Sequence, residues 1–227
     1  MKKTLTLFLE ALMSENPRAT LESAEFESIL AELIPELLLL KGAEQNILYH
    51  KEDVWTHSMM CVEAAAKVKD RSSNPLGFML GALLHDIGKP ISARQKPCWF
   101  NDTRYIVTMN PNHAKAGAPI AAEICRRLAL DEELATYVVA FVRWHDVLFD
   151  INVKEEYLSD EKALSRITEA HNANGCIQDY VLFNCLVDAP AKIAGPKAKT
   201  VPIVRAWELI ERSSLEESVK AEILQWR

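Results

Sequence analysis

Cysteine, glycine and long hydrophobic runs are all scarce in this sequence, and each shortage excludes a class of protein. The five cysteines are scattered without a CxxC pair, which argues against a disulfide framework or a zinc knuckle and favours a reducing cytoplasm. The most apolar run, "LIPELLLLKG", contains Pro35 and Glu36 and is too short to span a bilayer, so we expect it in a protein core. Only seven glycines and few alternating apolar segments argue against a β-rich fold.

Positive charge is also in short supply, because 26 lysines and arginines face 32 aspartates and glutamates for a net charge of -6. This balance argues against an extended nucleic-acid partner and gives no attraction to an anionic membrane. An anionic substrate would need a local positive site. The N-terminal "MKKTLTLFLEALM" has the lysines and apolar run of a signal peptide, but Glu10 interrupts the run, so we expect an amphipathic helix and a cytoplasmic protein.

Helical patterns with identifiable stops cover most of the chain, and they predict an all-α fold with one core. Helices are expected at residues 3–14, 20–41 with a kink at Pro35, 54–69, 75–86, 113–130, 131–145, 159–174, 176–194, 201–212 and 214–226. The residues placed to cap four of them are Asp53, Asn74, Asn112 and Asp131. A short β-hairpin is expected within residues 90–110, turning at Asn101 and Asp102, and a polar loop is expected between the helices at 131–145 and 159–174.

Ionisable residues recur at helical spacing on the apolar faces of five of these helices. The residues placed inward are His57, His85, Asp86, His113, His145 and Asp188. One such histidine is more often a core residue bonded to a carbonyl than a ligand. Six buried ionisable groups are different, because each is costly unless it is neutralised or paired, and a shared metal would satisfy all of them. Imidazole and carboxylate donors favour iron, manganese, zinc, cobalt or nickel over a soft-metal site.

The motif "HDIG" followed by Lys89 resembles the HD-domain superfamily of metal-dependent phosphohydrolases, an all-helical fold. His57 precedes the motif, and His113, His145 and Asp188 follow it, in the order of the six-ligand variant that holds two metals. Within that superfamily, "DVWTHS", "ALLHDIGKP" and "HAKAGAPIA" are most similar to the HD region of bacterial CCA-adding tRNA nucleotidyltransferases. The resemblance covers residues 46–195, and its ordered motif set is specific.

The resemblance implies a single HD helical bundle with a small hairpin insertion. We expect residues 1–45 to form helices packed on the core, residues 46–195 to form the HD core, and residues 196–227 to complete it. Too few residues precede the match for a nucleotidyltransferase head, so we expect the HD part to stand alone. A homodimer is left open by the apolar faces outside the match.

The resemblance also assigns site residues. The first of two divalent metals would be held by His57, His85, Asp86 and Asp188. The second would be held by His113 and His145, with Asp86 bridging. Asp86 and Lys89 are the expected catalytic residues, and Lys89 would contact a phosphate oxygen unless it is a solvated loop lysine. His50 and His171 are interpreted as structural.

The expected function is hydrolysis of a small nucleotide-like phosphoester or anhydride by a metal-activated hydroxide. The substrate would be a 2',3'-cyclic phosphodiester, a nucleoside monophosphate or a dinucleoside polyphosphate. Two other classes remain open at this point, a mixed-valent di-iron oxygenase and a non-catalytic regulatory HD module. Trp99, Arg104 and Tyr105 on the hairpin would either stack on a base or anchor the hairpin.

Overall fold

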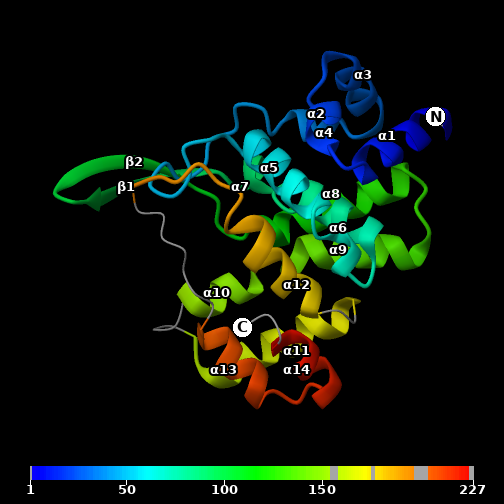
Figure 1. Ribbon diagram of the computed structural model, residues 1–227. Coiled ribbons are helices and arrows are strands. Elements are labelled where there is room, and N and C mark those ends of the chain that lie inside the picture. Colours follow the sequence, from blue (N-terminus) through cyan, green and yellow to red (C-terminus); the bar gives the residue numbers. More distant parts are fainter. Residues whose placement is uncertain (1, 154–157, 175–176, 197–203, 225–227) are drawn as a thin grey trace.

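The computed structural model describes residues 2–153, 158–174, 177–196 and 204–224, in which the regular elements are helices apart from one antiparallel hairpin (Figure 1). The predicted all-α class is therefore confirmed. The helices before the hairpin are α1 (Lys2–Met13), α2 (Pro17–Leu21), α3 (Ala24–Leu33), α4 (Pro35–Leu38), α5 (Val54–Ala66), the 3-10 turn η1 (Lys69–Arg71), α6 (Pro75–Leu84) and α7 (Lys89–Ser92). The hairpin strands are β1 (Arg94–Phe100) and β2 (Thr103–Met109). The later helices are α8 (His113–Arg127), α9 (Glu132–Trp144), α10 (Val147–Val153), α11 (Asp160–Asn174), α12 (Ile177–Phe183), the π-helix η2 (Asn184–Asp188), α13 (Val204–Arg212) and α14 (Glu217–Leu224).

Side-chain caps begin three of the four helices where capping was predicted. Asp53, Asn74 and Asp131 each accept a hydrogen bond from the backbone N–H three residues later, at 2.8, 2.9 and 2.9 Å. The prediction for Asn112 is wrong. Its backbone has a left-handed φ of 55°, and its side chain makes no capping bond to α8. A cap residue normally has an extended backbone, which aims its side chain at the first turn.

Three predicted segments differ from the structure. The helix expected at residues 20–41 is divided into α2, α3 and α4, because Ser23 caps a new helix and Ile34, before Pro35, has a φ of -142°. The polar loop expected after residue 145 contains α10, whose Val147, Leu148 and Ile151 are fully buried. The helix expected at 176–194 continues past α12 only as the π-helix η2.

The hairpin turns as predicted. Asn101 and Asp102 have φ values of 47° and 58°, the left-handed pair that a two-residue turn between strands requires. The strands pair in register from Arg94 with Met109 to Phe100 with Thr103. The ribbon leaves the helical body beside α7 and extends away from it (Figure 1).

A cluster of aromatic rings joins α6, α9 and α12 at the centre of the molecule. Phe78, Phe141 and Phe183 are fully buried, and their ring centroids lie 5.1 to 6.2 Å apart in edge-to-face pairs. Gly81 lets α6 approach this cluster closely, since a Cβ there would lie 2.5 Å from the Phe141 ring. Packing of these rings therefore fixes α6, α9 and α12 to one another, and these helices lead directly to His85, His145 and Asp188.

Helices outside the central bundle pack on the same core. Phe8 and Leu12 of α1 are fully buried, and α1 contacts α6 while α2 contacts α5. Near the other end, α13 contacts α10 and α11, and α14 contacts α12. The division at residues 45 and 195 stays a prediction. Within the described residues, no helix is both long and apolar enough to cross a bilayer.

The aromatic cluster makes a quantitative prediction for stability. Phe141→Ala removes a ring that packs on three helices, so the free energy of unfolding should fall by about 3 to 5 kcal/mol. Phe149→Ala is the matched control, because Phe149 is 43% exposed and should cost far less. Urea unfolding followed by circular dichroism measures both, and equal losses would contradict this account of the core.

Candidate metal centre

Five helices place the predicted site residues at a common point. His57 lies on the first turn of α5, and His85 and Asp86 directly follow α6. His113 begins α8, His145 follows α9, and Asp188 ends η2. With Cys61, these side chains form two groups whose possible ligand atoms lie within 4.8 Å of one another. The first group is His57, Cys61, His85 and Asp188, and the second is Asp86, His113 and His145. A further group of this kind, His50, Glu52 and His57, shares His57 with the first.

Each of the four imidazole rings is oriented by a backbone carbonyl. The Nδ1 contacts are His57 to Ala191 O at 2.8 Å, His85 to Ala82 O at 2.9 Å, His113 to Asn110 O at 3.1 Å and His145 to Val142 O at 2.9 Å. A carbonyl oxygen only accepts, so each Nδ1 carries a proton and donates it. In a neutral ring the remaining nitrogen, Nε2, is then an unprotonated acceptor, the form that binds metals.

The Nε2 atoms face one another in pairs. His57 Nε2 lies 3.4 Å from His85 Nε2, and His113 Nε2 lies 3.1 Å from His145 Nε2. Two buried acceptors at this distance repel unless a positive charge lies between or beside them. Each pair of imidazole nitrogens therefore fits a bound metal cation.

Asp86 serves both pairs, one oxygen each. Its Oδ2 lies 3.1 Å from His85 Nε2 and 3.7 Å from His57 Nε2. Its Oδ1 lies 3.2 Å from His113 Nε2 and 3.9 Å from His145 Nε2. Asp188 adds an oxygen to the first pair only, at 3.1 Å from His57 Nε2. This is the arrangement that a bridging carboxylate needs.

Burial and neighbouring charges favour the metal-binding forms of His145, Asp86 and Asp188, but not that of His85. Burial, with the neighbouring His113 and His85 rings, lowers the pKa of His145 to about 3, so this ring is neutral. Burial opposes ionisation of Asp86, but His85 and Lys89 outweigh it and hold the pKa of this carboxyl well below its usual range. Burial likewise opposes ionisation of Asp188, yet the neighbouring His57 ring lowers its pKa. For His85, burial is outweighed by the Asp86 carboxylate, which raises the pKa of the ring, so a metal must displace a proton more strongly held than usual at this ring.

Lys89 lies inside the centre. Its side chain is 11% exposed, and its Nζ forms an ion pair with Asp86 Oδ2 at 2.5 Å and donates a hydrogen bond to Gln45 Oε1 at 2.7 Å. The alternative interpretation of a solvated loop lysine is wrong. The more exposed side chains of the centre are His113 at 17% and Asp188 at 30%, so solvent reaches the site along the edge that they form.

Several polar residues that the sequence analysis did not select support the centre. Glu52 accepts from the Ile193 backbone N–H at 2.9 Å and contacts His50 Nδ1 at 2.8 Å, which holds the segment that carries the Ala191 carbonyl. Asn184 donates to the His145 carbonyl at 2.7 Å. Glu52 precedes its helix and falls outside the apolar stripes, whereas Asn184 shares the helical spacing of Ile177 and Asp188. Cys61 did have a signal, since it lies four residues after His57.

The other candidates lie elsewhere. Trp99, 69% exposed, pairs with Arg104 across the hairpin, whereas Tyr105 pairs with Cys98 and therefore faces the opposite side. The three side chains do not form one stacking platform. His171, on α11, belongs to neither ligand group.

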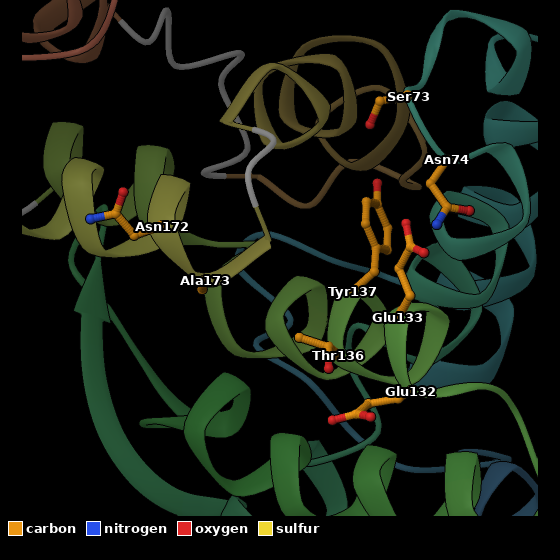
Figure 2. A pocket seen from close by; sticks show the side chains of 8 residues that line it. All are labelled: Ser73, Asn74, Glu132, Glu133, Thr136, Tyr137, Asn172 and Ala173. Carbon is orange, nitrogen blue, oxygen red and sulfur yellow. The ribbon is translucent and has the colours of Figure 1, made fainter.

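A hollow of about 740 Å³ lies between the residues before α6, the helix α9 and the end of α11 (Figure 2), and none of its lining residues belongs to the metal centre. Its lining residues are Ser73, Asn74, Glu132, Glu133, Thr136, Tyr137, Asn172 and Ala173. Two carboxylates and no basic side chain line it, which is unfavourable for a phosphate. The chemistry therefore points to the histidine clusters rather than to this hollow.

Comparison with known proteins identifies the family. The HD domain model matches residues 54–174, more than half of the chain. The chain belongs to the HD domain family. The match includes five of the six converging residues, all but Asp188, and the predicted resemblance is confirmed. Membership of this family implies a divalent metal, as the histidine and aspartate clusters also do.

Several curated relatives share this HD domain. The chain is 32% identical over 135 residues to the multifunctional CCA protein of Halorhodospira halophila, covering 59% of this chain and 29% of the relative. It is 30% identical over 167 residues to that of Ralstonia nicotianae, covering 72% and 34%. It is 27% identical over 178 residues to the bifunctional uridylyltransferase/uridylyl-removing enzyme of Mycobacterium tuberculosis, covering 78% and 19%. The chain thus spans about a third or less of these relatives.

The support that Glu52 gives to His57 can be tested in this HD domain. Glu52→Ala removes the acceptor for the Ile193 N–H and loosens the carbonyl that orients His57, so the affinity for zinc should fall about 10- to 100-fold. Glu63→Ala is the control, because Glu63 on the same region of the chain is half exposed and pairs only with Arg18 among the described residues. Isothermal titration measures both, and wild-type affinity for Glu52→Ala would show that Glu52 does not position the ring.

Proposed function

We propose that this HD domain binds two divalent transition metals and hydrolyses a phosphoester or phosphoanhydride of a small nucleotide-like substrate. The observation that supports it is the pair of facing acceptor sets joined by one carboxylate, Asp86. His57, His85 and Asp188 would hold the first metal with Asp86 Oδ2. His113 and His145 would hold the second with Asp86 Oδ1. When bound, the metals would supply Lewis acidity and a water of lowered pKa.

The protein's own contribution is to fix the ligands before substrate arrives. Four backbone carbonyls set the tautomer and direction of the rings, and burial keeps His145 neutral. A site prepared in this way need not reorganise as charge develops on the reacting phosphate. No nucleophilic side chain is required.

Lys89 would bind a phosphate oxygen. An ammonium group has three protons. Lys89 donates one of them to Gln45, and its charge pairs with Asp86 Oδ2. A further proton can bind a substrate oxygen, and among the described residues Lys89 is the one buried lysine of a chain with a net charge of -6. This arrangement supplies the local positive site that the overall charge demands.

A second hollow suits the rest of a small substrate. It has a volume of about 340 Å³ and lies against α7, the helix that Lys89 begins. Its lining residues are Ala43, Glu44, Pro90, Ala93, Arg94, Gln95 and Thr108. The volume lies in the range of small-molecule sites, and Arg94 offers a further cationic group. These features favour a nucleotide-sized ligand over an extended polymer.

One relative supports a nucleotide-like substrate by its name, which includes removal of uridylyl groups. The experiment is a substrate panel of 2',3'-cyclic nucleotides, nucleoside monophosphates and dinucleoside polyphosphates, with and without oxygen. Oxygen-independent hydrolysis of one class is the expected result. Oxygen-dependent turnover with bound iron would instead identify an oxygenase, and a metal-loaded but inactive protein would indicate a regulatory module.

Asp86→Asn tests the bridging role. The amide keeps the shape of the side chain but removes the charge that both metals share, so metal affinity should fall more than about a hundredfold and hydrolysis should be lost. His171→Ala is the control, because His171 lies outside both ligand groups. Elemental analysis and steady-state kinetics measure the effect, with circular dichroism to confirm helicity. Full activity in Asp86→Asn would refute the assignment.

Lys89→Met separates phosphate binding from metal binding. Methionine keeps the unbranched chain and removes the ammonium, so the metals should remain while the hydrolysis rate falls about 100- to 1000-fold. Bound metals neutralise Asp86 in place of the lysine, so the fold should tolerate the change. Unchanged kinetics with a full metal complement would remove the proposed role of Lys89.

A further inference from the structure

Cys61 lies within the first metal-binding group. It is one helical turn after His57 on α5 and is fully buried. Its Sγ is 3.7 Å from His57 Nε2, and it lies within 4.8 Å of the possible ligand atoms of His57, His85 and Asp188. A sulfur atom therefore accompanies the two nitrogens and the carboxylate oxygen at this point.

The spacing can be compared with that of ligands on one ion. For a tetrahedral zinc site, bonds of about 2.0 Å to nitrogen and about 2.3 Å to sulfur imply N–N edges of about 3.3 Å and N–S edges of about 3.5 Å. The distance from His57 Nε2 is 3.4 Å to His85 Nε2, 3.7 Å to Cys61 Sγ and 3.1 Å to Asp188 Oδ1. The N–N and N–S distances match the edges of a shared ion within a few tenths of an ångström, and the N–O distance is of similar length.

Ordinary burial does not account for this position. Cys125, on α8, is just as buried, with 2% exposure, yet it belongs to no group of metal-ligating side chains in the described part of the chain. Cys61 differs because three other ligand atoms converge beside it, and two of them are imidazole nitrogens that face each other. A thiol that is only hydrogen-bonded in the core does not require three other metal-ligating atoms beside it.

We propose that Cys61 is a sulfur ligand of the first metal, and that the two metal sites consequently prefer different ions. This inference rests on the proposed metal centre. With Cys61 added to His57, His85, Asp188 and the bridging Asp86, the first site favours a borderline-soft ion such as zinc or cobalt, and the thiol releases its proton to solvent when the ion binds. The second site has only nitrogen and oxygen ligands and keeps an open position for substrate and water.

Cobalt(II) titration of the full metal-free chain tests this ligand directly. The first equivalent of cobalt should produce a thiolate-to-cobalt charge-transfer band in the near ultraviolet, in addition to the visible d–d bands. Cys61→Ser should lose the ultraviolet band and bind the first cobalt about 10- to 100-fold more weakly. Cys125→Ser, the matched buried control, should behave as the wild type.

The possible outcomes distinguish a failure of the proposed sulfur ligand from a failure of the proposed metal centre. Cobalt binding with d–d bands but no charge-transfer band in the wild type would overturn the sulfur ligand alone. No cobalt binding at all would overturn both. Should Cys61→Ser fail to fold, X-ray absorption on the wild type with one cobalt decides the question. A sulfur neighbour at about 2.3 Å supports the proposal, and an environment of only nitrogen and oxygen contradicts it.

Competition tests the different preferences of the two sites. Zinc should displace the first cobalt and remove the charge-transfer band, whereas an equal concentration of manganese should leave the band intact because manganese favours oxygen ligands. Equal displacement of the band by manganese and zinc would contradict the proposed selectivity.

Discussion

Four imidazole rings with their acceptor nitrogens turned toward one another are the constraint on which the rest of this structure depends. Each ring gives its Nδ1 proton to a backbone carbonyl, so the four Nε2 atoms face one another beside two ionised carboxylates. In a buried site such groups repel strongly unless cations join them. The two-metal proposal follows from this repulsion more directly than from any single distance.

The orientation of the imidazole rings explains why His85 and Asp86 stand together at the end of α6. The last carbonyls of a helix lack intrahelical partners, and His85 and His145 use this by donating to the carbonyls three residues earlier, in α6 and α9. The ring is thereby aimed off the end of its helix. Asp86, the next residue after His85, then reaches both histidine pairs with separate oxygens.

Packing below the centre holds the rings where the metals need them. Phe183 contacts the edges of His85 and His145, with centroids 5.2 and 6.3 Å apart, and it also packs on Phe141. After Phe183 the chain changes from α-helix to π-helix, and Asp188 ends that segment. π-Helical turns are rare and often mark functional sites, which agrees with the position of Asp188 beside His57.

Helical spacing and the HD motif were sufficient to predict the fold class and to select six residues that the structure brings together. They worked because each of these residues extends an apolar stripe at a helix end, a local pattern. Glu52 and Asn184 were missed, since their value depends on backbone groups distant in sequence, at Ile193 and His145. The helix α10 was missed because a few polar residues near Asp150 concealed the spacing of Val147 and Ile151.

The most direct test of the central claim is the metal content of the protein purified without added metal or chelator. Elemental analysis should find about two equivalents of transition metal per chain, as a two-metal site requires. If the protein held none, even after iron, manganese, cobalt and zinc had been supplied and the excess removed, the facing imidazoles would have some other cause and the proposed centre would be wrong.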